Sequence, residues 1–325
     1  MAQNRITSAE VALRAGVSRS AVSRVFTVGA SASKQTVEKV RLAAEELGYR
    51  PNILARAMVS GHSRMIGLVV AYLDNQFYPE TLEKLSNALQ EKGYHVLVFM
   101  AGKDSQSIDG VIEEILDYQV DGIIAASVAL SSDLATRCRT AGVPMVLFNR
   151  DQDDPLMSSV TSDNIAGGRK VAELFLASGH KRIGYISGWE GASTQRDREA
   201  GFVARLSEAG RVLYARETGD FRMDTAREAA LKMFSTDPPD AVFVANDHMA
   251  ISVMDTLRHE LGIKVPEDVS VVGYDDVPAI AWPAYDLTTV RQRSNIMVAK
   301  TVEILLTEIE EDGVCLLYTS PSPRD

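Results

Sequence analysis

From residue 65 onwards, short continuous apolar runs alternate with amphipathic stretches, and this rhythm restricts the fold more than any other feature of the sequence. These runs, which are apolar except for Arg182 and Ser270, lie at 66–70, 96–99, 122–125 and 144–148 and, after a polar break near residue 164, at 182–186, 241–244 and 269–273. Strands that are apolar throughout, instead of on alternate residues, are typical of parallel sheets that helices cover on both faces. The pattern therefore predicts an α/β body of two lobes, each with a doubly wound parallel sheet.

The charge of the chain is divided unevenly between its first 64 residues and the rest. The first 64 residues carry ten Lys and Arg against four Asp and Glu, a net charge of +6, and the other 261 carry 24 against 40, a net charge of −16. A basic module at one end of a chain is expected of a protein that neutralises phosphate groups, whereas an acidic remainder is an ordinary soluble surface. The first 64 residues are therefore predicted to bind DNA.

The basic head begins with the signals of two short helices. Thr7 and Glu10 have the spacing of a capping box, in which each residue satisfies an unpaired amide of the helix start. Gly16 can take the positive φ of a sharp turn, and Ser18 can cap a second helix over 19–26. The head is thus expected to be a small all-α module.

The second helix separates its apolar side chains from its hydrogen-bonding ones. Val22 and Val25 are at helical spacing and face the first helix. The outer face then carries Arg19, Ser20, Ser23 and Arg24. A third helix, which Ser33 caps, completes a core too small for a catalytic pocket. An amphipathic hairpin with a solvated charged face is the alternative, but the order and spacing of the signals favour a helix-turn-helix.

The head contains the blocks Val11-Ala12, Ala15-Gly16-Val17-Ser18, Val22-Ser23-Arg24-Val25, Leu47-Gly48-Tyr49 and Pro51-Asn52. Through these blocks it resembles the lac and gal repressor family of bacterial transcription regulators. The resemblance implies that Arg19, Ser20 and Arg24 contact bases in the major groove, where an Arg that binds guanine contributes about 1–3 kcal/mol of discrimination. It also implies contacts to phosphates, which position the protein without reading sequence. These phosphate contacts are Thr7, Ser18, Ser23 and Thr36.

A short segment after the head, residues 52–59, could form about two turns of helix, which are marginal in water without a partner. The resemblance implies a hinge helix here that folds only on DNA and pairs with the same helix of a second subunit. Asn52 is then a further DNA contact, and Ala55 and Met58 stand where the family inserts an apolar side chain into the minor groove and bends the duplex. For 60–63 the sequence favours a flexible linker.

The body from about residue 65 to 310 also resembles that family, whose two-lobed fold is like that of periplasmic binding proteins. The blocks that carry the resemblance are Val244-Ala245-Asn246-Asp247, Val271-Val272-Gly273-Tyr274-Asp275-Asp276 and Leu287-Thr288-Thr289-Val290. Polar side chains follow several strands, and ligands of parallel sheets bind at those carboxyl ends. Together with this pattern, the resemblance implies that the effector contacts are Phe77, Tyr78, Asn149, Arg196, Arg198, Phe221, Asn246 and Asp275. Capping of the following helix is an equally weighted alternative for Asn164 and Asp247.

The expected boundaries separate a head, a hinge, a body and a tail. The helix-turn-helix domain is placed at 1–50, the hinge helix and linker at 51–64, and the two-lobed body at 65–312, with the first lobe at 65–161 and 291–312 and the second at 162–290. Phe77 and Tyr78 are expected in the loop after the first strand. The tail, 313–325, shows no helical or strand continuity and is interpreted as a foreign end of a truncated reading frame, with a native disordered tail as the alternative.

Two other classes of protein share a body of this kind. An enzyme is disfavoured because neither G-x-G-x-x-G nor G-x-x-x-x-G-K-[ST] follows a strand, and the five histidines lack the spacing of metal ligands. Catalytic residues, metal and cofactor are therefore expected to be absent. A two-lobed sugar-binding protein without DNA function is the other alternative, but it would need a secretion signal and would lack the basic head.

The sequence thus predicts a cytoplasmic transcription regulator, with repression as the expected sign. The two cysteines lack the spacing of a disulfide framework, and no apolar leader or run of about 18 apolar residues occurs, so no membrane association is expected. The expected partners are double-stranded operator DNA, a sugar or sugar derivative as effector, and a second copy or more of the chain, because two-fold protein symmetry matches palindromic half-sites.

Overall fold

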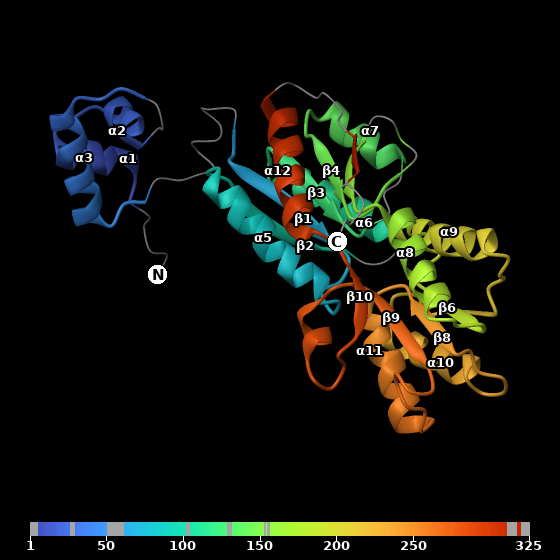
Figure 1. The fold of residues 1–325 in the computed structure, drawn as a ribbon. Helices are drawn as coiled ribbons and strands as arrows, with labels where there is room; N and C mark the ends of the chain where they lie inside the picture. The colour runs from blue at the N-terminus through green and yellow to red at the C-terminus, as the bar shows by residue number, and fades with distance from the viewer. Residues whose placement is uncertain are drawn as a thin grey trace. The chain divides into compact units, whose positions relative to one another are not determined.

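The computed structural model describes residues 6–26, 30–50, 62–101, 105–128, 132–152, 154, 157–310 and 317–319. The chain divides into two compact units, Met1–Arg64 and Met65–Asp325, called the head and the body below (Figure 1). The predicted hinge contacts Asn52, Ala55 and Met58 lie outside the described residues. Within the described part of the chain, no helix is both long and apolar enough to span a bilayer.

The head is built from three helices around a small core. They are α1 (Ser8–Ala15), α2 (Arg19–Phe26) and α3 (Lys34–Leu47). Each helix contributes a fully buried valine: Val11, Val22 and Val40. The predicted capping box is confirmed, because Thr7 Oγ1 accepts from the Glu10 amide while the Glu10 carboxylate accepts from the Thr7 amide. The predicted turn is also confirmed, because Gly16 ends α1 with φ +64°.

The first lobe of the body is a parallel sheet with helices on both faces. Its elements are β1 (Met65–Val70), α5 (Phe77–Glu91), β2 (His95–Met100), α6 (Ser105–Asp117), β3 (Gly122–Ala126), α7 (Ser132–Thr140), β4 (Met145–Phe148), β5 (Ser158–Thr161), α12 (Ser294–Glu310) and β11 (Leu317–Thr319). The strand order is β11-β5-β4-β3-β1-β2. Because successive side chains of a strand point to opposite faces, Ile66 and Leu68 join the core under α5 and α12, whereas Val69 joins the core under α6 and α7.

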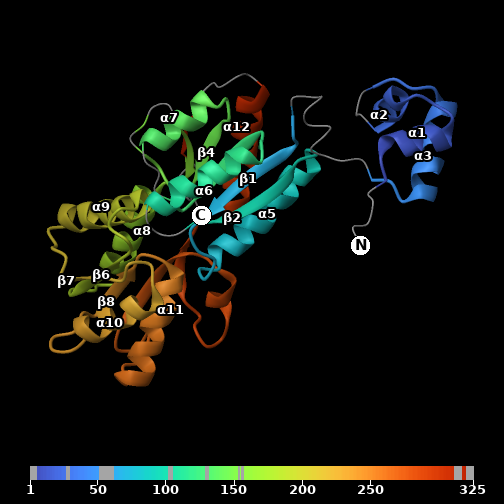
Figure 2. The same ribbon diagram turned by 180° about the vertical axis from the view of Figure 1, so that it is seen from behind.

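The second lobe repeats this construction and is seen from both sides in Figures 1 and 2. Its elements are α8 (Asn164–Ala177), β6 (Ile183–Ser187), α9 (Ser193–Glu208), β7 (Ala215–Thr218), α10 (Met223–Met233), β8 (Ala241–Val244), α11 (Asp247–Asp255), the short helices η1 (Thr256–Glu260) and η2 (Pro278–Ala281), β9 (Ser270–Asp275) and β10 (Thr288–Arg291). The strand order is β10-β9-β8-β6-β7, and every pairing is parallel. The predicted two-lobed fold is therefore confirmed.

Two glycines bring α8 and α9 backbone to backbone. A Cβ atom on Gly168 would lie 2.0 Å from the carbonyl oxygen of Arg198, and one on Gly201 would lie 2.0 Å from the carbonyl oxygen of Ile165. Contacts below 3.0 Å are not tolerated by real Cβ atoms. The two glycines therefore fix the distance between the helices and, with it, the position of the Arg198 side chain.

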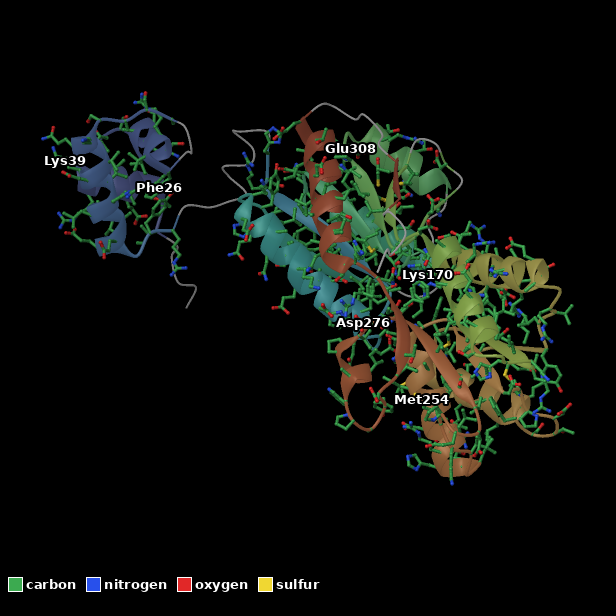
Figure 3. The ribbon with its side chains drawn as sticks, viewed as in Figure 1. Phe26, Lys39, Lys170, Met254, Asp276 and Glu308 are labelled. Carbon is green, nitrogen blue, oxygen red and sulfur yellow. The ribbon has the colours of Figure 1, made fainter. Side chains whose placement is uncertain are left out.

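The chain crosses between the lobes after β5 and again after β10, and α12 then packs on α5 of the first lobe. Ser158 of β5 donates a hydrogen bond to the buried carboxylate of Glu308 on α12, which Figure 3 labels. The expectation that the tail has no strand is wrong, because Leu317–Thr319 form β11 and pair in parallel with β5. The physical reason is that an outer strand leaves unpaired amides and carbonyls, which a short extended segment can satisfy.

Candidate functional site

The outer side of α2 presents the residues that the sequence predicts to contact bases. Arg19, Ser20, Ser23 and Arg24 are all exposed, whereas Val22 faces the core. Residues four apart on a helix lie in one row, so Arg19 and Ser23 form one row of this face and Ser20 and Arg24 the next. The four side chains therefore form one continuous polar surface with two positive charges.

Two of the hydroxyl groups predicted to contact phosphates, those of Ser18 and Thr36, form hydrogen bonds at the first turns of α2 and α3. The Ser18 hydroxyl accepts a hydrogen bond from the Ala21 amide at 3.2 Å and lies 2.8 Å from the Ser20 hydroxyl. The Thr36 hydroxyl lies 2.8 Å from that of Ser33, which accepts from the Thr36 amide. These caps leave the amino ends of α2 and α3 ordered, and such ends favour phosphate groups.

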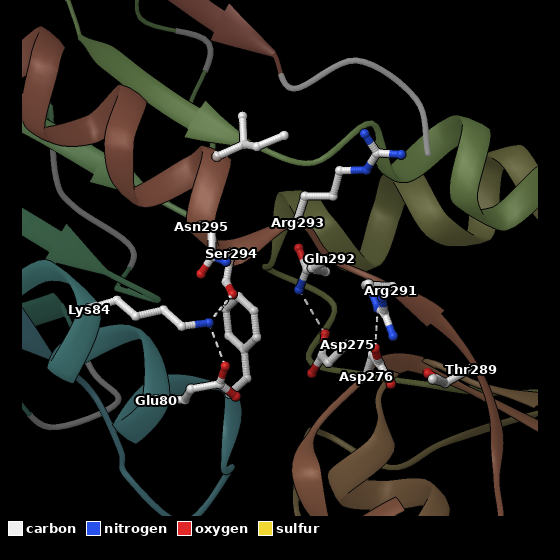
Figure 4. A pocket seen from close by; sticks show the side chains of 12 residues that line it. Glu80, Lys84, Asp275, Asp276, Thr289, Arg291, Gln292, Arg293, Ser294 and Asn295 are labelled. Carbon is white, nitrogen blue, oxygen red and sulfur yellow. Dashed lines mark hydrogen bonds and ion pairs between the residues drawn. The ribbon is translucent and has the colours of Figure 1, made fainter. Parts of the chain in front are cut away.

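A pocket of about 680 Å³ opens in the body where β10 continues into α12. Figure 4 shows its lining. The lining residues are Phe77, Glu80, Lys84, Asp275, Asp276, Thr289, Arg291, Gln292, Arg293, Ser294, Asn295 and Ile296. Only Phe77 and Asp275 of these were predicted as effector contacts. Asp276 directly follows β9, and the others come from α5 and from the second crossover with its flanking residues. The predicted lobe boundary between residues 290 and 291 was the sequence signal that pointed to the crossover.

Asp275 is the predicted residue that receives most contacts at this pocket. It ends β9 with φ +128° and is almost completely buried. Gln292 donates to its Oδ1 at 2.7 Å, Asn75 of the first lobe donates to its Oδ2 at 3.4 Å, and Arg198 Nη2 lies 3.6 Å from Oδ1. Burial raises the pKa of Asp275, and the Arg198 guanidinium opposes that shift. The carboxylate therefore joins both lobes and one crossover.

Arg198 is held on every side by lobe 2. Only 2% of it is exposed, its Nε donates to Asn164 Oδ1 at 2.9 Å, and its Nη1 donates to the carbonyl oxygen of Ala245 at 2.6 Å. Its Cζ lies 3.7 Å from the centroid of the Tyr274 ring, a favourable cation–π distance. For Asn164 the capping alternative is wrong, because Asp163 caps α8 while Asn164 accepts from Arg198.

The first lobe contributes a second buried cluster around Asn149. This residue follows β4 with φ +57°, and its Nδ2 donates to Tyr78 Oη at 3.1 Å. The Tyr78 hydroxyl also hydrogen-bonds to Ser127, and burial raises the pKa of Tyr78. Phe77 and Tyr78 form the first turn of α5, so their predicted place in a loop is wrong; Phe77 starts that helix, since Asn75 Oδ1 accepts from its amide.

The remaining predicted effector contacts take different positions. Asn246 caps α11, because its Oδ1 accepts from the Met249 amide at 3.0 Å. Phe221 has φ +55° and is buried. Arg196 is exposed, so the structure does not bring it to the buried cluster. It lies two residues before Arg198 on α9, and residues at this spacing point to opposite sides of a helix.

Asp247 has a supporting role beneath the second crossover. It is fully buried, its Oδ2 accepts from the amides of Asp276 and Val277 at 2.7 and 3.0 Å, and its Oδ1 accepts from the Thr289 hydroxyl at 2.6 Å. Burial, with the nearby Asp275 carboxylate as a second cause, raises the pKa of Asp247 to about 7. Asp247 therefore fixes the loop after β9 and its distance from β10.

Curated proteins similar to this chain over most of its length are transcriptional repressors. The HTH-type transcriptional repressor PurR of Vibrio vulnificus is 30% identical over 309 residues, which cover 94% of this chain and 92% of the relative. The probable HTH-type transcriptional repressor ExuR of Bacillus subtilis is 28% identical over 318 residues, which cover 94% of this chain and 93% of the relative.

Solved structures and family models agree with these relatives. The lac repressor dimer bound to operator and the anti-inducer ONPF matches with a TM-score of 0.87 at 27% identity, and the CelR–cellobiose complex with 0.71 at 30%; both matches cover 97% of each chain. Residues 63–303 match the family of periplasmic binding proteins and the sugar binding domain of LacI family, and residues 7–52 match the bacterial regulatory proteins, lacI family. This chain therefore belongs to the lacI family of bacterial regulatory proteins.

Proposed function

We propose that this protein is a repressor that binds operator DNA through its head and changes its affinity for that DNA when a small effector binds between the lobes of its body. One observation carries the proposal: the same chain has an exposed Arg and Ser surface on α2 and a buried polar cluster to which both lobes contribute. A sugar-binding protein that does not bind DNA would not need the exposed Arg and Ser surface.

On the DNA side, Arg19, Ser20 and Arg24 contact bases in the major groove. Their exposure on one face of a capped helix supports this role, since a recognition helix needs exposed side chains and a fixed backbone. The phosphate contacts are Thr7, Ser18, Ser23 and Thr36, and the hinge residues Asn52, Ala55 and Met58 contact the minor groove. DNA of this kind is bound in the cytoplasm, where the bacterial chromosome lies.

On the effector side, the contacts are Asp275, Arg198, Asn149, Asn246, Phe77, Tyr78 and Phe221. Buried acceptors and donors beside aromatic rings are suited to a small hydroxylated molecule such as a sugar derivative. Because Asp275 contacts Asn75 of the other lobe, a ligand that competes for this carboxylate changes the contact between the lobes. By linkage, effector and DNA then alter each other's affinity by the same factor.

The protein acts as a homodimer, because two heads with two-fold symmetry match the two half-sites of a palindromic operator. One surface of the first lobe supports self-association. The outer strand β2 leaves Val98 and Met100 exposed, at 52% and 51%, on an edge of the sheet with which no other described strand pairs.

Selection from a randomised DNA pool tests this proposal. The purified chain is expected to enrich one palindromic sequence, and a small-molecule screen on that sequence is expected to find a compound that changes the affinity. Enrichment of no sequence by a folded protein would contradict the DNA function, whereas enrichment that no screened sugar or sugar derivative affects would contradict the effector function.

A further inference from the structure

Arg150 is a buried cation that forms no close ion pair with a carboxylate of the described residues. It follows Asn149 at the end of β4, and only 5% of it is exposed. Its Nη1 donates to two neutral oxygens, the Asn149 carbonyl at 3.0 Å and the Thr194 hydroxyl at 2.7 Å. Its Nε has no hydrogen-bond partner among the described residues, and the same holds for Asn149 Oδ1. A buried charge without an ion-pair partner is costly, so an arrangement of this kind is suited to binding an anion.

The Arg150 guanidinium lies at the amino end of α9, which is itself suited to an anion. The contact to Thr194 brings it there, and the amide of Asp151 donates to the Ser193 hydroxyl at 2.9 Å. The helix is 16 residues long, and Ala192 at its N-cap has no side-chain oxygen for the first amides. The end is buried, with Ser193 and Thr194 almost inaccessible. A helix amino end and a guanidinium attract the same negative group.

The charges nearby leave room for one more negative group. Two guanidiniums, those of Arg150 and Arg198, face the carboxylate of Asp275, which lies 3.6 Å from Arg198 and is also affected by the charge of Arg150. The neighbouring Asp247 carboxyl has a pKa raised to about 7, so it contributes less negative charge than an ordinary aspartate. Asn149 adds no charge. Phe221, whose ring centroid is 5.8 Å from Arg150 Cζ, covers the guanidinium with an apolar face.

From this arrangement we infer that the effector is an acid, whose carboxylate or phosphate binds Arg150 and the amino end of α9, while its hydroxyl groups reach the Asp275 side. The inference rests on the proposed effector function and specifies its ligand class. A carboxylate would accept from Arg150 Nε and from the first amides of α9, and a hydroxyl of the same ligand could donate to Asn149 Oδ1.

Calorimetric titration of the full-length protein with matched pairs tests the inference. The pairs are glucose with glucuronate, galactose with galacturonate, and glucose with glucose 6-phosphate, so that the carboxylate and phosphate sources are separated; acetate and inorganic phosphate are titrated alone. In at least one pair the acid is expected to bind about tenfold or more tightly than its neutral partner. Arg150→Gln is expected to abolish that advantage, Arg150→Lys to keep part of it, and Arg211→Gln, at an exposed arginine of the second lobe, to leave it unchanged.

Several outcomes would overturn the inference. They are equal or tighter binding of the neutral sugars, absence of binding by every acid, unchanged acid affinity in a folded Arg150→Gln variant, and binding of acetate or phosphate as tight as that of the sugar acids. A neutral sugar that alters operator affinity would refute the acid effector and leave the regulator intact. Failure to bind any operator would contradict the proposed DNA function instead, and it would not affect the titration, which uses no DNA.

Discussion

Asn75 of the first lobe donates a hydrogen bond to Asp275 of the second lobe across 3.4 Å, although 200 residues separate them in the sequence. The same carboxylate accepts from Gln292, and Gln292 Oε1 accepts from the Ser162 hydroxyl at 2.8 Å. Ser162 and Gln292 lie on the two crossovers between the lobes. A change at Asp275 therefore affects both connections at once, which gives the proposed effector site a physical route to the lobe orientation.

Replacing Asp275 tests this route. Asp275→Asn removes the charge opposite Arg198 and places an amide where donors converge, so the free energy of unfolding is expected to fall by about 1–3 kcal/mol. Effector-dependent change of operator affinity is expected to disappear, while operator binding itself remains. Denaturant titration and DNA binding with and without effector measure the two effects. The control Asp237→Asn, at the exposed ion pair with Arg182, should change stability by less than about 1 kcal/mol.

Arg19→Ala tests base recognition. The variant is expected to lose about 1–3 kcal/mol of discrimination between operator and altered half-sites, because one bidentate contact to a base is removed. Ser23→Ala, at a predicted phosphate contact on the same face, should weaken all sequences alike. Competition binding with single-base variants of the operator separates the two patterns. Uniform weakening by Arg19→Ala would show that this residue does not read sequence.

Gly168→Ala tests how Arg198 is positioned. The added Cβ would meet the carbonyl oxygen of Arg198 at 2.0 Å, so α8 and α9 must separate, and the free energy of unfolding is expected to fall by about 1–3 kcal/mol together with effector affinity. Gly110→Ala on α6 is the matched control, because nothing lies within 4 Å of its Cβ. That change should stabilise by about 0.5–1 kcal/mol. Equal behaviour of the two variants would contradict the close-packing argument.

The raised pKa of Asp247 predicts how the free energy of unfolding depends on pH. Burial raises the pKa of Asp247 to about 7, so the folded protein retains a proton that the unfolded chain releases near the ordinary value of 3.8. Its contribution to stability is present below that unfolded value and is lost as the pH rises towards 7, with a slope of at most about 1.4 kcal/mol per pH unit. Urea unfolding of the wild type at several pH values should show the loss, and Asp247→Asn should show a smaller slope. A wild type with flat stability over this range would refute the assignment.

Val98→Lys tests the role of the β2 edge in self-association. The variant places a charge on an exposed apolar strand, so sedimentation is expected to show monomers, and operator affinity to fall, while thermal unfolding of the monomer stays cooperative. Val212→Lys is the control, because Val212 is 83% exposed in the second lobe. An undiminished dimer in Val98→Lys would place the interface elsewhere.

The sequence predicted those elements whose own residues determine them. Strand β8 coincides with its apolar run at 241–244, and α2 with its predicted range, because local burial and capping decide both. Strand β5 was not predicted, since its Ser158 and Ser159 are buried through hydrogen bonds to Glu308 and Asp151 and leave no apolar run. Strand β7 was not predicted either, because half of its residues are exposed and polar.

The candidate site likewise contains residues that a local sequence pattern predicted and residues that only the packing of the fold brings together. Asp275 and Asn149 were found because polar residues directly follow apolar strands, a local pattern. Arg150 was overlooked, because its contact with Thr194 depends on how the two lobes meet. Arg196 and Arg198 look alike in sequence, and only the packing of α9 on α8 decides which of them is buried.

The most direct test of the central claim is fluorescence anisotropy of the selected operator with the full-length protein, over a salt series, with and without effector. The account predicts salt-dependent binding that prefers this operator over random DNA, and a change of about 5–150-fold in affinity when the effector is added. Binding without sequence preference, or an affinity that a bound effector leaves unchanged, would contradict it.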